Sequence, residues 1–360
     1  MYCSYTAVPA RWLRPNTLRS LRHSSQVCPV ICLLLASVLL AGCGEKIEEF
    51  GGPTMGSHYS LKYLAGEGSP EPAALKAEVE ALLAQVDQQM STWRSDSDLS
   101  EFNRLPAGSC RVMSDAVLTL VRAGEQLSRD SDGAFDLTVS PLLELWGFGP
   151  QSRGERVPTV DEVAAVQANV GHRHLSIEGQ KLCKEAAVQL SLDSLGAGFS
   201  VDLIAARLNE LGVSSYLLDI TGEIKAAGVK PDGSAWRIAI EAPRDDQQVA
   251  QKVIALDGLG VSTSGDYRNY FEKEGRRYSH TLDPKTGAPI THRLASVTVI
   301  DPSAQRADGL STLLMVLGPE RGLAFADQHG IAAFFVVRQA NGFITHSSRA
   351  FARQFDGGQP

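Results

Sequence analysis

The chain has 360 residues, of which 43% are hydrophobic and 21% are charged, so it can bury a sizeable core as one large domain or two ordinary ones. Its first 42 residues hold four of the 34 basic residues and none of the 41 acidic ones, so the formal net charge goes from −7 to −11 without them. An acidic body of this kind argues against nucleic acid as a partner.

The first 42 residues are predicted to be a targeting segment rather than part of the fold. Four arginines precede an apolar run over residues 30–40, and these 11 residues are too few to cross a membrane as a helix. Because the hydrocarbon core is about 30 Å thick, a signal peptide is favoured over a transmembrane anchor. The run ends in Leu40-Ala41-Gly42-Cys43, which resembles the bacterial lipobox and implies cleavage before Cys43 and a lipid on its thiol. The alternative is ordinary secretion with an incidental cysteine.

After a tether over residues 43–52, the spacing of apolar residues predicts helices and strands in mixed order. The helices span residues 73–90, 115–129, 201–211 and 308–317, with Ser114 and Ser200 as N-caps and Gly318-Pro319 as a stop signal. The strands span residues 58–64, 215–220, 236–241, 252–256, 277–282, 295–300 and 332–338. Because helices and strands do not alternate strictly, we predict an α+β fold rather than a doubly wound sheet.

Two cysteines, Cys110 and Cys183, remain in the body of the chain. They are able to pair in an oxidising compartment, but two lone cysteines define neither a disulfide framework nor a zinc-ligand cluster. The sequence therefore leaves their pairing open.

A short glycine-rich stretch, Gly196-Ala197-Gly198, precedes the predicted helix over residues 201–211. The N-terminus of a helix offers unpaired N–H groups and a partial positive charge to a phosphate. However, Val201 stands where a dinucleotide-binding fingerprint has its third glycine, and no strand-helix-strand unit supplies an acidic residue about 20 positions later. A Rossmann site is therefore disfavoured.

Asp308 and Thr312 lie four residues apart on a predicted helix, so a carboxylate and a hydroxyl project from the same face one turn apart. Two oxygen ligands suit a hard cation such as Mg²⁺, which completes its shell with waters and substrate phosphates. Taken alone, the spacing favours a helix cap and a surface hydroxyl over a metal site.

Three further residues each have two interpretations, one functional and one structural. His280 lies at the end of a predicted strand before Asp283-Pro284, where it is a candidate general base or part of a structural turn. The aromatic rings of Trp93 and Phe135 are placed either to stack on a flavin or adenine or to pack in the core.

The order of several motifs along the chain closely resembles the ApbE family, the FAD:protein FMN transferases. The motifs are Met55-Gly56-Ser57, Ser91-Thr92-Trp93, Ala134-Phe135-Asp136, Thr221-Gly222-Glu223-Ile224, Tyr278-Ser279-His280-Thr281-Leu282-Asp283-Pro284, Ala307-Asp308-Gly309-Leu310-Ser311-Thr312, and residues 98–103, 145–149, 262–271 and 315–318. The resemblance spans residues 52–345. It implies an ApbE-like, T-fold-related mixed sheet with flanking helices, forming a single catalytic unit over residues 53–350 before a tail over residues 351–360.

The resemblance also assigns roles to single residues. It implies that FAD is bound by Met55, Trp93, Ala134, Phe135, Asp136, Ser191, Ala197 and Leu282. It implies that Ser194, Asp308 and Thr312 hold Mg²⁺ and that His280 is the catalytic base. The chain departs from the family at two of these positions, because Ser191 stands where an Asp is usual and Ala197 where a Lys or Glu is usual. Asp193 lies two residues from Ser191, on the same face if the segment is extended. Either Asp193 takes over the work of the missing carboxylate, or this member binds FAD with fewer polar contacts.

The activity that the resemblance implies is Mg²⁺-dependent transfer of FMN from FAD to a Ser or Thr hydroxyl of another protein, with release of AMP. The implied acceptors are periplasm-exposed flavoprotein subunits of membrane redox complexes, carrying a short Asp-Gly-(Ser or Thr)-Gly-Ala-(Ser or Thr) motif. A lipid on Cys43 implies the periplasmic face of the inner membrane, with the outer membrane as an alternative. Two rival functions are a metal-dependent FAD pyrophosphatase, which gives free FMN and AMP, and a flavin-binding lipoprotein without turnover.

Overall fold

The computed structural model describes residues 46–357, apart from residues 67, 153, 245, 246, 248 and 268. These residues belong to one compact unit that begins at residue 45. The predicted signal peptide and Cys43 lie outside the described residues. Within the described part, none of the helices combines the length and the apolar character that crossing a membrane requires.

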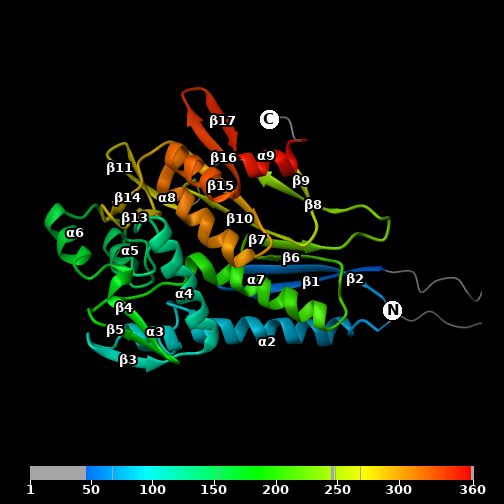
Figure 1. The fold of residues 1–360 in the computed structure, drawn as a ribbon, viewed down its shortest axis with the longest axis horizontal. Helices are drawn as coiled ribbons and strands as arrows, with labels where there is room; N and C mark the ends of the chain where they lie inside the picture. The colour runs from blue at the N-terminus through cyan, green and yellow to red at the C-terminus, as the bar shows by residue number, and fades with distance from the viewer. Residues whose placement is uncertain are drawn as a thin grey trace, which may run out of the picture. The chain divides into compact units, whose positions relative to one another are not determined.

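An eight-stranded antiparallel sheet forms the centre of the unit (Figure 1). In spatial order its strands are β1 (Lys46–Thr54), β2 (Ser57–Ala65), β6 (Tyr216–Ile220), β7 (Glu223–Ala227), β10 (Leu259–Gly265), β15 (Leu294–Asp301), β16 (Ala332–Gln339) and β17 (Gly342–Ser347). Apolar residues alternate along its strands, so that both faces of the sheet are covered. In β16, for example, Phe335 and Val337 belong to one buried cluster and Phe334 and Val336 to another.

Three long helices lie along one face of this sheet: α2 (Pro72–Met90), α7 (Asp193–Glu210) and α8 (Ala304–His329) (Figure 1). The apolar side of α2 and α7 packs on Tyr59, Leu61 and Tyr63 of β2. The hairpin of β8 (Trp236–Glu241) and β9 (Ala250–Leu256) and the short helix α9 (Arg349–Phe355) belong to the cluster on the other face. This arrangement positions α7 and α8 side by side.

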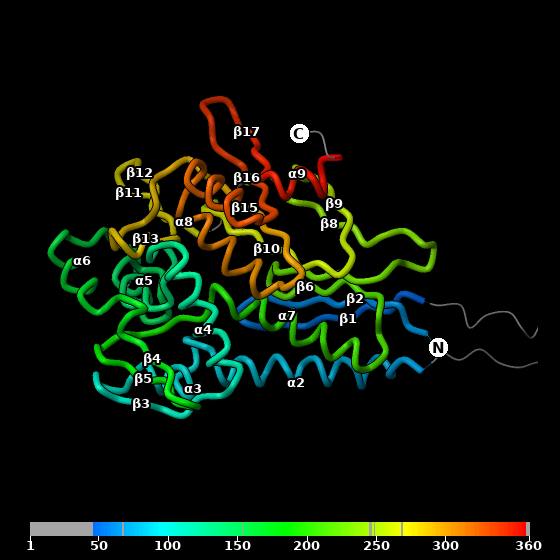
Figure 2. Tube along the Cα trace, viewed as in Figure 1, coloured from blue at the N-terminus to red at the C-terminus, as the bar shows by residue number. Residues whose placement is uncertain are grey.

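The chain between α2 and α7 forms a second group of elements, drawn in cyan and green at one end of the trace (Figure 2). It holds α3 (Asp98–Asn103), β3 (Ser109–Val112), α4 (Asp115–Asp130), α5 (Ser140–Trp146), α6 (Val160–Gln167), the 3₁₀ helix η1 (His172–His174), β4 (Leu175–Glu178) and β5 (Lys181–Lys184). Cys110 of β3 lies directly opposite Cys183 of β5, and the two form a disulfide. The pairing that the sequence left open is therefore present.

Two short hairpins, β11 (Tyr270–Lys273) with β12 (Arg276–Ser279) and β13 (Leu282–Asp283) with β14 (Ala288–Pro289), lie between β10 and β15 in the chain. Side chains of α5 and α6 hold the turn between β13 and β14. The indole N–H of Trp146 donates to the carbonyl of Gly287 at 2.8 Å, and the amide of Gln167 donates to the carbonyls of Pro284 and Lys285 at 2.9 and 2.7 Å.

The predicted helix over residues 201–211 is wrong at its start, because α7 begins at Asp193. Ser200, predicted as the N-cap, lies inside the helix, and its hydroxyl donates to the carbonyl of Gly196 at 2.8 Å. The small, buried residue Gly198 allows this first part of α7 to pack closely on α8, which an apolar periodicity does not reveal. Ser191 and Asp193 are therefore not successive same-face residues of a strand.

The predicted helix end at Gly318-Pro319 is confirmed as a break, because Gly318 is non-helical (φ 79°, ψ −178°) and separates the two helices that together make up α8. The second helix, which continues to His329, was not predicted. Pro319 has no N–H, so the carbonyl of Met315 lacks its helical donor. The Nε2 atom of His292 lies 2.9 Å from that carbonyl oxygen and replaces the missing donor. His292 thereby caps the end of the first helix, and the chain enters the second helix across a kink.

Both ends of the predicted domain extend further than the sequence suggested. Residues 46–52, predicted as tether, form most of β1, because Phe50 packs edge-on against Tyr59 and Tyr63 and the backbone pairs with β2. Residues 351–355, predicted as tail, belong to α9, in which Phe351 is fully buried and the Ser348 hydroxyl caps its N–H at 3.2 Å.

Candidate active site

The site begins where α7 and α8 cross, at Gly198 and Asp308. The backbone N–H of Gly198 donates to Oδ2 of Asp308 at 3.0 Å, and Asp308 is only 5% exposed. A Cβ on Gly198 would lie 2.4 Å from the carbonyl oxygen of Ala304, so a side chain there would force the helices apart. Glycine is therefore required for the close approach that buries Asp308.

Asp202, one turn further along α7, fixes the start of α8. Its carboxylate accepts hydrogen bonds from the N–H groups of Ala304 and Gln305, both at 3.1 Å, and from the Ser303 hydroxyl at 2.8 Å. The Lys225 ammonium completes this cap at 2.7 Å. A carboxylate from one helix thus satisfies the free amides at the N-terminus of the other, which orients the first turns of α8, including Asp308.

Three carboxylates influence one another at this crossing. Burial raises the pKa of Asp308 to about 7, and the nearby charge of Asp193 adds to this, while the Gly198 N–H opposes it. Burial and then the charge of Asp308 raise the pKa of Glu223 well above its usual value. Asp193 keeps solvent contact on one side, yet the protein around its carboxylate raises its pKa as well. Compensating positive charge is therefore favoured here.

Hydroxyl groups surround Glu223 and connect it to α8. Thr221 and Ser262 donate to its two carboxylate oxygens at 3.2 and 3.3 Å. The Ser262 hydroxyl also lies 3.0 Å from that of Ser311 on α8, the turn that carries Asp308. Glu223 was not among the predicted site residues, although it lies in the motif Thr221-Gly222-Glu223-Ile224. A charged residue directly after the buried strand β6 and a two-residue turn was the available signal.

The three predicted metal ligands lie at this helix crossing. Asp308 and Thr312 are one turn apart on α8, and Ser194 is one turn before Gly198 on α7. Residues four apart share a helix face, so Ser194 projects from the side of α7 that meets Asp308. Hydroxyl and carboxylate oxygens form the donor set that a hard divalent cation prefers, so the residues present fit Mg²⁺.

His280 has the tautomer that a general base needs. Its Nδ1 lies 2.9 Å from the carbonyl oxygen of Asn269, so Nδ1 carries the proton and donates it. Nε2 is then left with its lone pair. Burial lowers the pKa of His280, which keeps the ring neutral near pH 7, and the edge of Phe148 packs against it at 6.4 Å between ring centres.

The loop predicted to bind FAD is tied to the turn that follows His280. Lys285 of that turn forms an ion pair with Asp132 at 2.6 Å, just before Ala134-Phe135-Asp136. Ala134, Phe135 and Leu282 are each at most 6% exposed, so their side chains pack in the interior and leave mainly backbone for a ligand.

The other residues predicted to bind FAD differ in the chemical groups that they present to a ligand. The carboxylate of Asp136 accepts from the N–H and hydroxyl of Thr138 and from the N–H of His172, at 2.7 to 2.8 Å. Trp93 is 71% exposed, which leaves its ring free to stack on a planar ligand, and Met55 occupies the β1–β2 turn with φ 46°. Ser191 is buried, and its hydroxyl accepts from the Asp193 N–H at 3.1 Å, while Ala197 is half-buried on α7.

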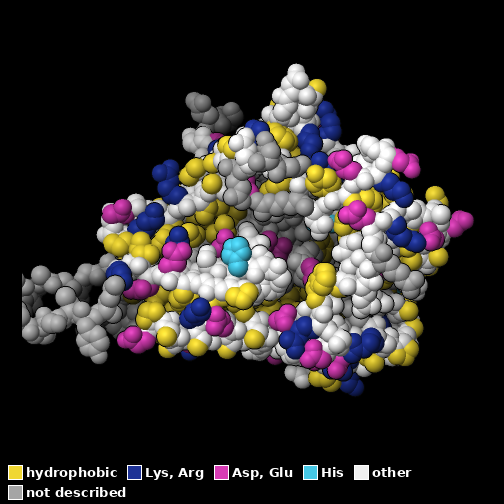
Figure 3. All heavy atoms as spheres, turned by 180° about the vertical axis from the view of Figure 1, so that it is seen from behind, with side chains coloured by type: hydrophobic (Ala, Val, Ile, Leu, Met, Phe, Trp, Pro, Cys, Tyr) yellow, Lys and Arg dark blue, Asp and Glu magenta, His cyan; other side chains and the backbone are white. Residues whose placement is uncertain are grey.

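Viewed from behind, the surface is hollowed near its middle, and Asp and Glu side chains lie along this hollow (Figure 3). Asp193, Glu223 and His280 each combine partial solvent contact with a pKa shifted by the surrounding protein. This combination is typical of groups that line a concave site.

A family model described as the ApbE family matches residues 55–335. The chain belongs to the ApbE family. The FAD:protein FMN transferase of Vibrio cholerae serotype O1 is 43% identical over 321 residues, which cover 88% of this chain and 96% of that protein. The protein of the same name from Escherichia coli K12 is 35% identical over 336 residues, covering 89% and 95%.

Solved ApbE structures share the fold. The apo crystal structure of the Pseudomonas stutzeri flavinyl transferase ApbE is 63% identical, with a TM-score of 0.83 over 88% of this chain and 98% of that one. The flavin transferase ApbE from Vibrio cholerae is 41% identical, with a TM-score of 0.80 over 86% and 100%. The predicted α+β fold of the ApbE type is therefore confirmed.

Proposed function

We propose that this chain transfers the FMN half of FAD to a Ser or Thr hydroxyl of another protein and releases AMP. Relatives of nearly full length carry the name FAD:protein FMN transferase, which supports flavin transfer from FAD to a protein. The observation that carries the proposal is the burial of Asp308 beside two further carboxylates at the α7–α8 crossing. Such a cluster of negative charges is unfavourable unless a cation neutralises it.

Asp308, Thr312 and Ser194 are the residues that would hold a divalent cation such as Mg²⁺. When bound, the cation acts as a Lewis acid that neutralises charge on the pyrophosphate of FAD. Asp202 and Gly198 keep Asp308 in place, because they fix the start of α8 against α7. Trp93 is the exposed ring that stacks on the flavin or the adenine.

His280 removes the proton of the acceptor hydroxyl as that oxygen attacks the phosphorus of the FMN half. The bond between this phosphorus and the bridging oxygen breaks, the oxygen leaves with AMP, and the new bond is a phosphodiester. The proton moves to Nε2 of His280, the nitrogen that Asn269 leaves free. A positioned base of this kind contributes roughly 10²- to 10⁴-fold in rate.

Asp193 takes over from the carboxylate that relatives usually place at position 191. Its backbone N–H already bonds to the Ser191 hydroxyl, so the two side chains start from adjacent points at the N-terminus of α7. A Ser191→Asp variant should therefore restore little, whereas Asp193→Asn should weaken FAD binding, as measured by quenching of flavin fluorescence. The reverse pattern would contradict the assignment.

We further propose that the mature chain is anchored by a lipid on Cys43 at the periplasmic face of the inner membrane, with the outer membrane as the alternative. Acceptors exposed on the same membrane would then meet the enzyme at a raised effective concentration. Metabolic labelling with an alkynyl palmitate analogue tests this, because Cys43→Ala should lose the label and leave the membrane fraction.

The activity test incubates the mature chain with FAD, Mg²⁺ and a soluble acceptor domain carrying Asp-Gly-Thr-Gly-Ala-Thr, and weighs the acceptor by mass spectrometry. The proposal predicts a mass gain equal to FMN less one water, which is one riboflavin 5′-phosphoryl group, and one AMP released for each acceptor modified. AMP release without the mass gain would favour the FAD pyrophosphatase, and bound flavin without AMP would favour the flavin-binding lipoprotein. Asp308→Ala is the matched inactive control.

A further inference from the structure

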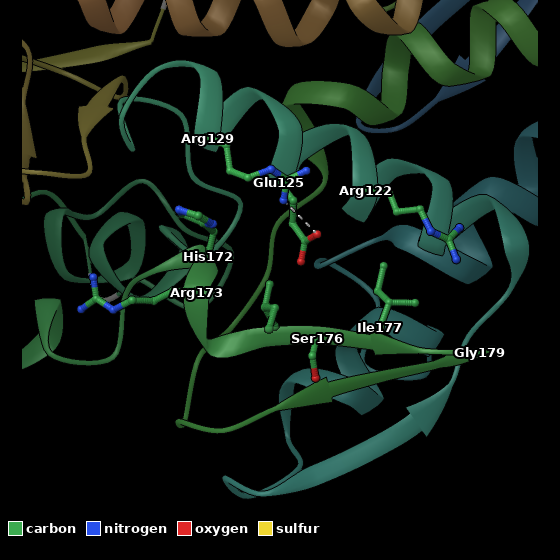
Figure 4. A pocket seen from close by; sticks show the side chains of 9 residues that line it. Arg122, Glu125, Arg129, His172, Arg173, Ser176, Ile177 and Gly179 are labelled. Carbon is green, nitrogen blue, oxygen red and sulfur yellow. Dashed lines mark ion pairs between the residues drawn. The ribbon is translucent and has the colours of Figure 1, made fainter.

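A second cavity, apart from the helix crossing, lies between α4 and the segment that contains η1 and β4. Its volume is about 570 Å³. Leu175 and Ile177 of β4 give it apolar surface, and Arg122, Glu125 and Arg129 approach it from α4 (Figure 4). We refer to these residues, with His172, Arg173, Ser176 and Gly179, as the arginine pocket.

The charge of the arginine pocket is opposite to that of the chain as a whole. It holds three arginines and one carboxylate, Glu125, in a chain whose formal net charge is −7. Glu125 lies between Arg122 and Arg129 on α4 and pairs with Arg129 at 3.6 Å (Figure 4). Arg122 and Arg173 are exposed, and no acidic side chain among the described residues pairs with either of them. The pocket therefore presents uncompensated positive charge around apolar surface.

The wall of the pocket is joined to the loop predicted to bind FAD. The N–H of His172 donates to the Asp136 carboxylate at 2.8 Å, and the N–H of Gly171 donates to the Thr138 hydroxyl at 2.7 Å. The Thr138 hydroxyl in turn donates to Asp136 at 2.7 Å. A ligand in the arginine pocket would therefore rest against the same structural unit that presents Ala134, Phe135 and Asp136.

We propose that the arginine pocket binds an acidic segment of the acceptor protein, with carboxylates on Arg122 and Arg173, with which no described acidic side chain pairs, and an apolar neighbour on Ile177. This inference rests on the proposed function, because it takes the acceptor to be a protein. Arginine forks match carboxylates in geometry, and charge complementarity raises the rate of encounter. The pocket selects the partner, while the α7–α8 crossing handles FAD.

The test separates binding from chemistry. The soluble acceptor domain, with its modified hydroxyl residue changed to Ala, is titrated calorimetrically into the mature chain. The double variant Arg122→Gln/Arg173→Gln should bind it roughly three- to tenfold more weakly, since each charge at a solvent-exposed rim contributes modestly. Gln is a good helix former at exposed positions, so α4 is retained.

The matched control is Arg237→Gln/Arg353→Gln, which removes two exposed arginines from β8 and α9. It should bind like the wild type, and in turnover the pocket variant should raise the KM for the acceptor more than it changes kcat. Equal affinity of pocket variant and wild type overturns the inference even if FMN transfer is observed. Failure of the wild type to transfer FMN overturns the proposed function, while the calorimetric comparison still decides the inference.

An anionic membrane is the other partner that such a pocket could take. Cosedimentation with vesicles containing phosphatidylglycerol distinguishes it. Vesicle binding that depends on Arg122 and Arg173, together with unchanged affinity for the acceptor domain, would assign the pocket to the membrane surface and overturn the proposal.

Discussion

The backbone of Gly198 and the carboxylate of Asp308 are hydrogen-bonded at a point where the helices leave no room for a side chain. We expect Gly198→Ala to push α8 away and lower the free energy of unfolding by about 1–3 kcal/mol, and to raise the Mg²⁺ concentration needed for turnover. Urea denaturation and a Mg²⁺ titration measure both effects. Gly196→Ala is the control, because a Cβ there meets nothing within 4 Å and alanine favours the helix. Equal behaviour of the two variants would contradict the packing argument.

The raised pKa of Asp308 predicts a pH-dependent stability in the absence of metal. The unfolded chain loses this proton near the ordinary aspartate value of about 3.9, whereas burial holds it in the folded protein up to a pKa of about 7. The stabilising contribution is therefore present at low pH and lost as pH rises through about 7. Thermal unfolding in chelator should show Tm falling over this window and recovering with Mg²⁺.

Asp308→Asn should flatten this part of the stability profile and abolish metal-dependent turnover. Mg²⁺ affinity of the wild type should weaken below about pH 7, because protons compete for the same carboxylate. A Tm that falls equally in Asp308→Asn would show that Asp193 or Glu223 causes the dependence instead.

His280→Ala should slow FMN transfer roughly 10²- to 10⁴-fold while FAD binding persists, because the base acts only on the acceptor hydroxyl. Since burial lowers the pKa of His280, the wild-type rate should begin to fall only below the usual histidine range as pH decreases. Single-turnover kinetics with flavin fluorescence for binding would measure this. His346→Ala, an exposed position on β17, serves as control, and a comparable loss there would remove the base assignment.

His292→Ala should lower the free energy of unfolding by about 1–3 kcal/mol, because it leaves the Met315 carbonyl without a donor inside α8. Burial lowers the pKa of His292, so its contribution is present above the ordinary histidine pKa of about 6.5 and is lost as pH falls through the lower folded value. Chemical denaturation across this range should show the acid-side loss in the wild type and a smaller one in the variant. An unchanged slope in the variant would contradict this.

Apolar spacing and capping residues were enough to predict the bounds of helices whose apolar face packs against a single neighbour. The spacing of Leu75, Val79, Val86 and Met90 and the cap at Ser114 gave the bounds of α2 and α4 to within one residue. The start of α7 was not accessible in this way, because it is held by small residues packed on another helix. The cap on Met315 at the kink of α8 was not accessible either, because it comes from His292, which is distant in sequence.

The residues of the candidate site were likewise predicted only in part from local sequence. Asp308 and Thr312 were recognisable from their spacing, and His280 from its motif. Glu223 was not, because its role depends on the Coulombic influence of Asp308 across the sheet and helix. The role of Asp202 as a cap for α8 was not predictable either, because it depends on the contact in space between α7 and the start of α8.

Asp202 and Gly198 together make α7 and α8 a single rigid piece, while the residues of the arginine pocket belong to the separate run of chain between α2 and α7. Attempts to redirect the protein toward new targets can therefore concentrate library diversity on α4, η1 and β4. The sequence of α7 and α8 would stay the same in every variant of such a screen.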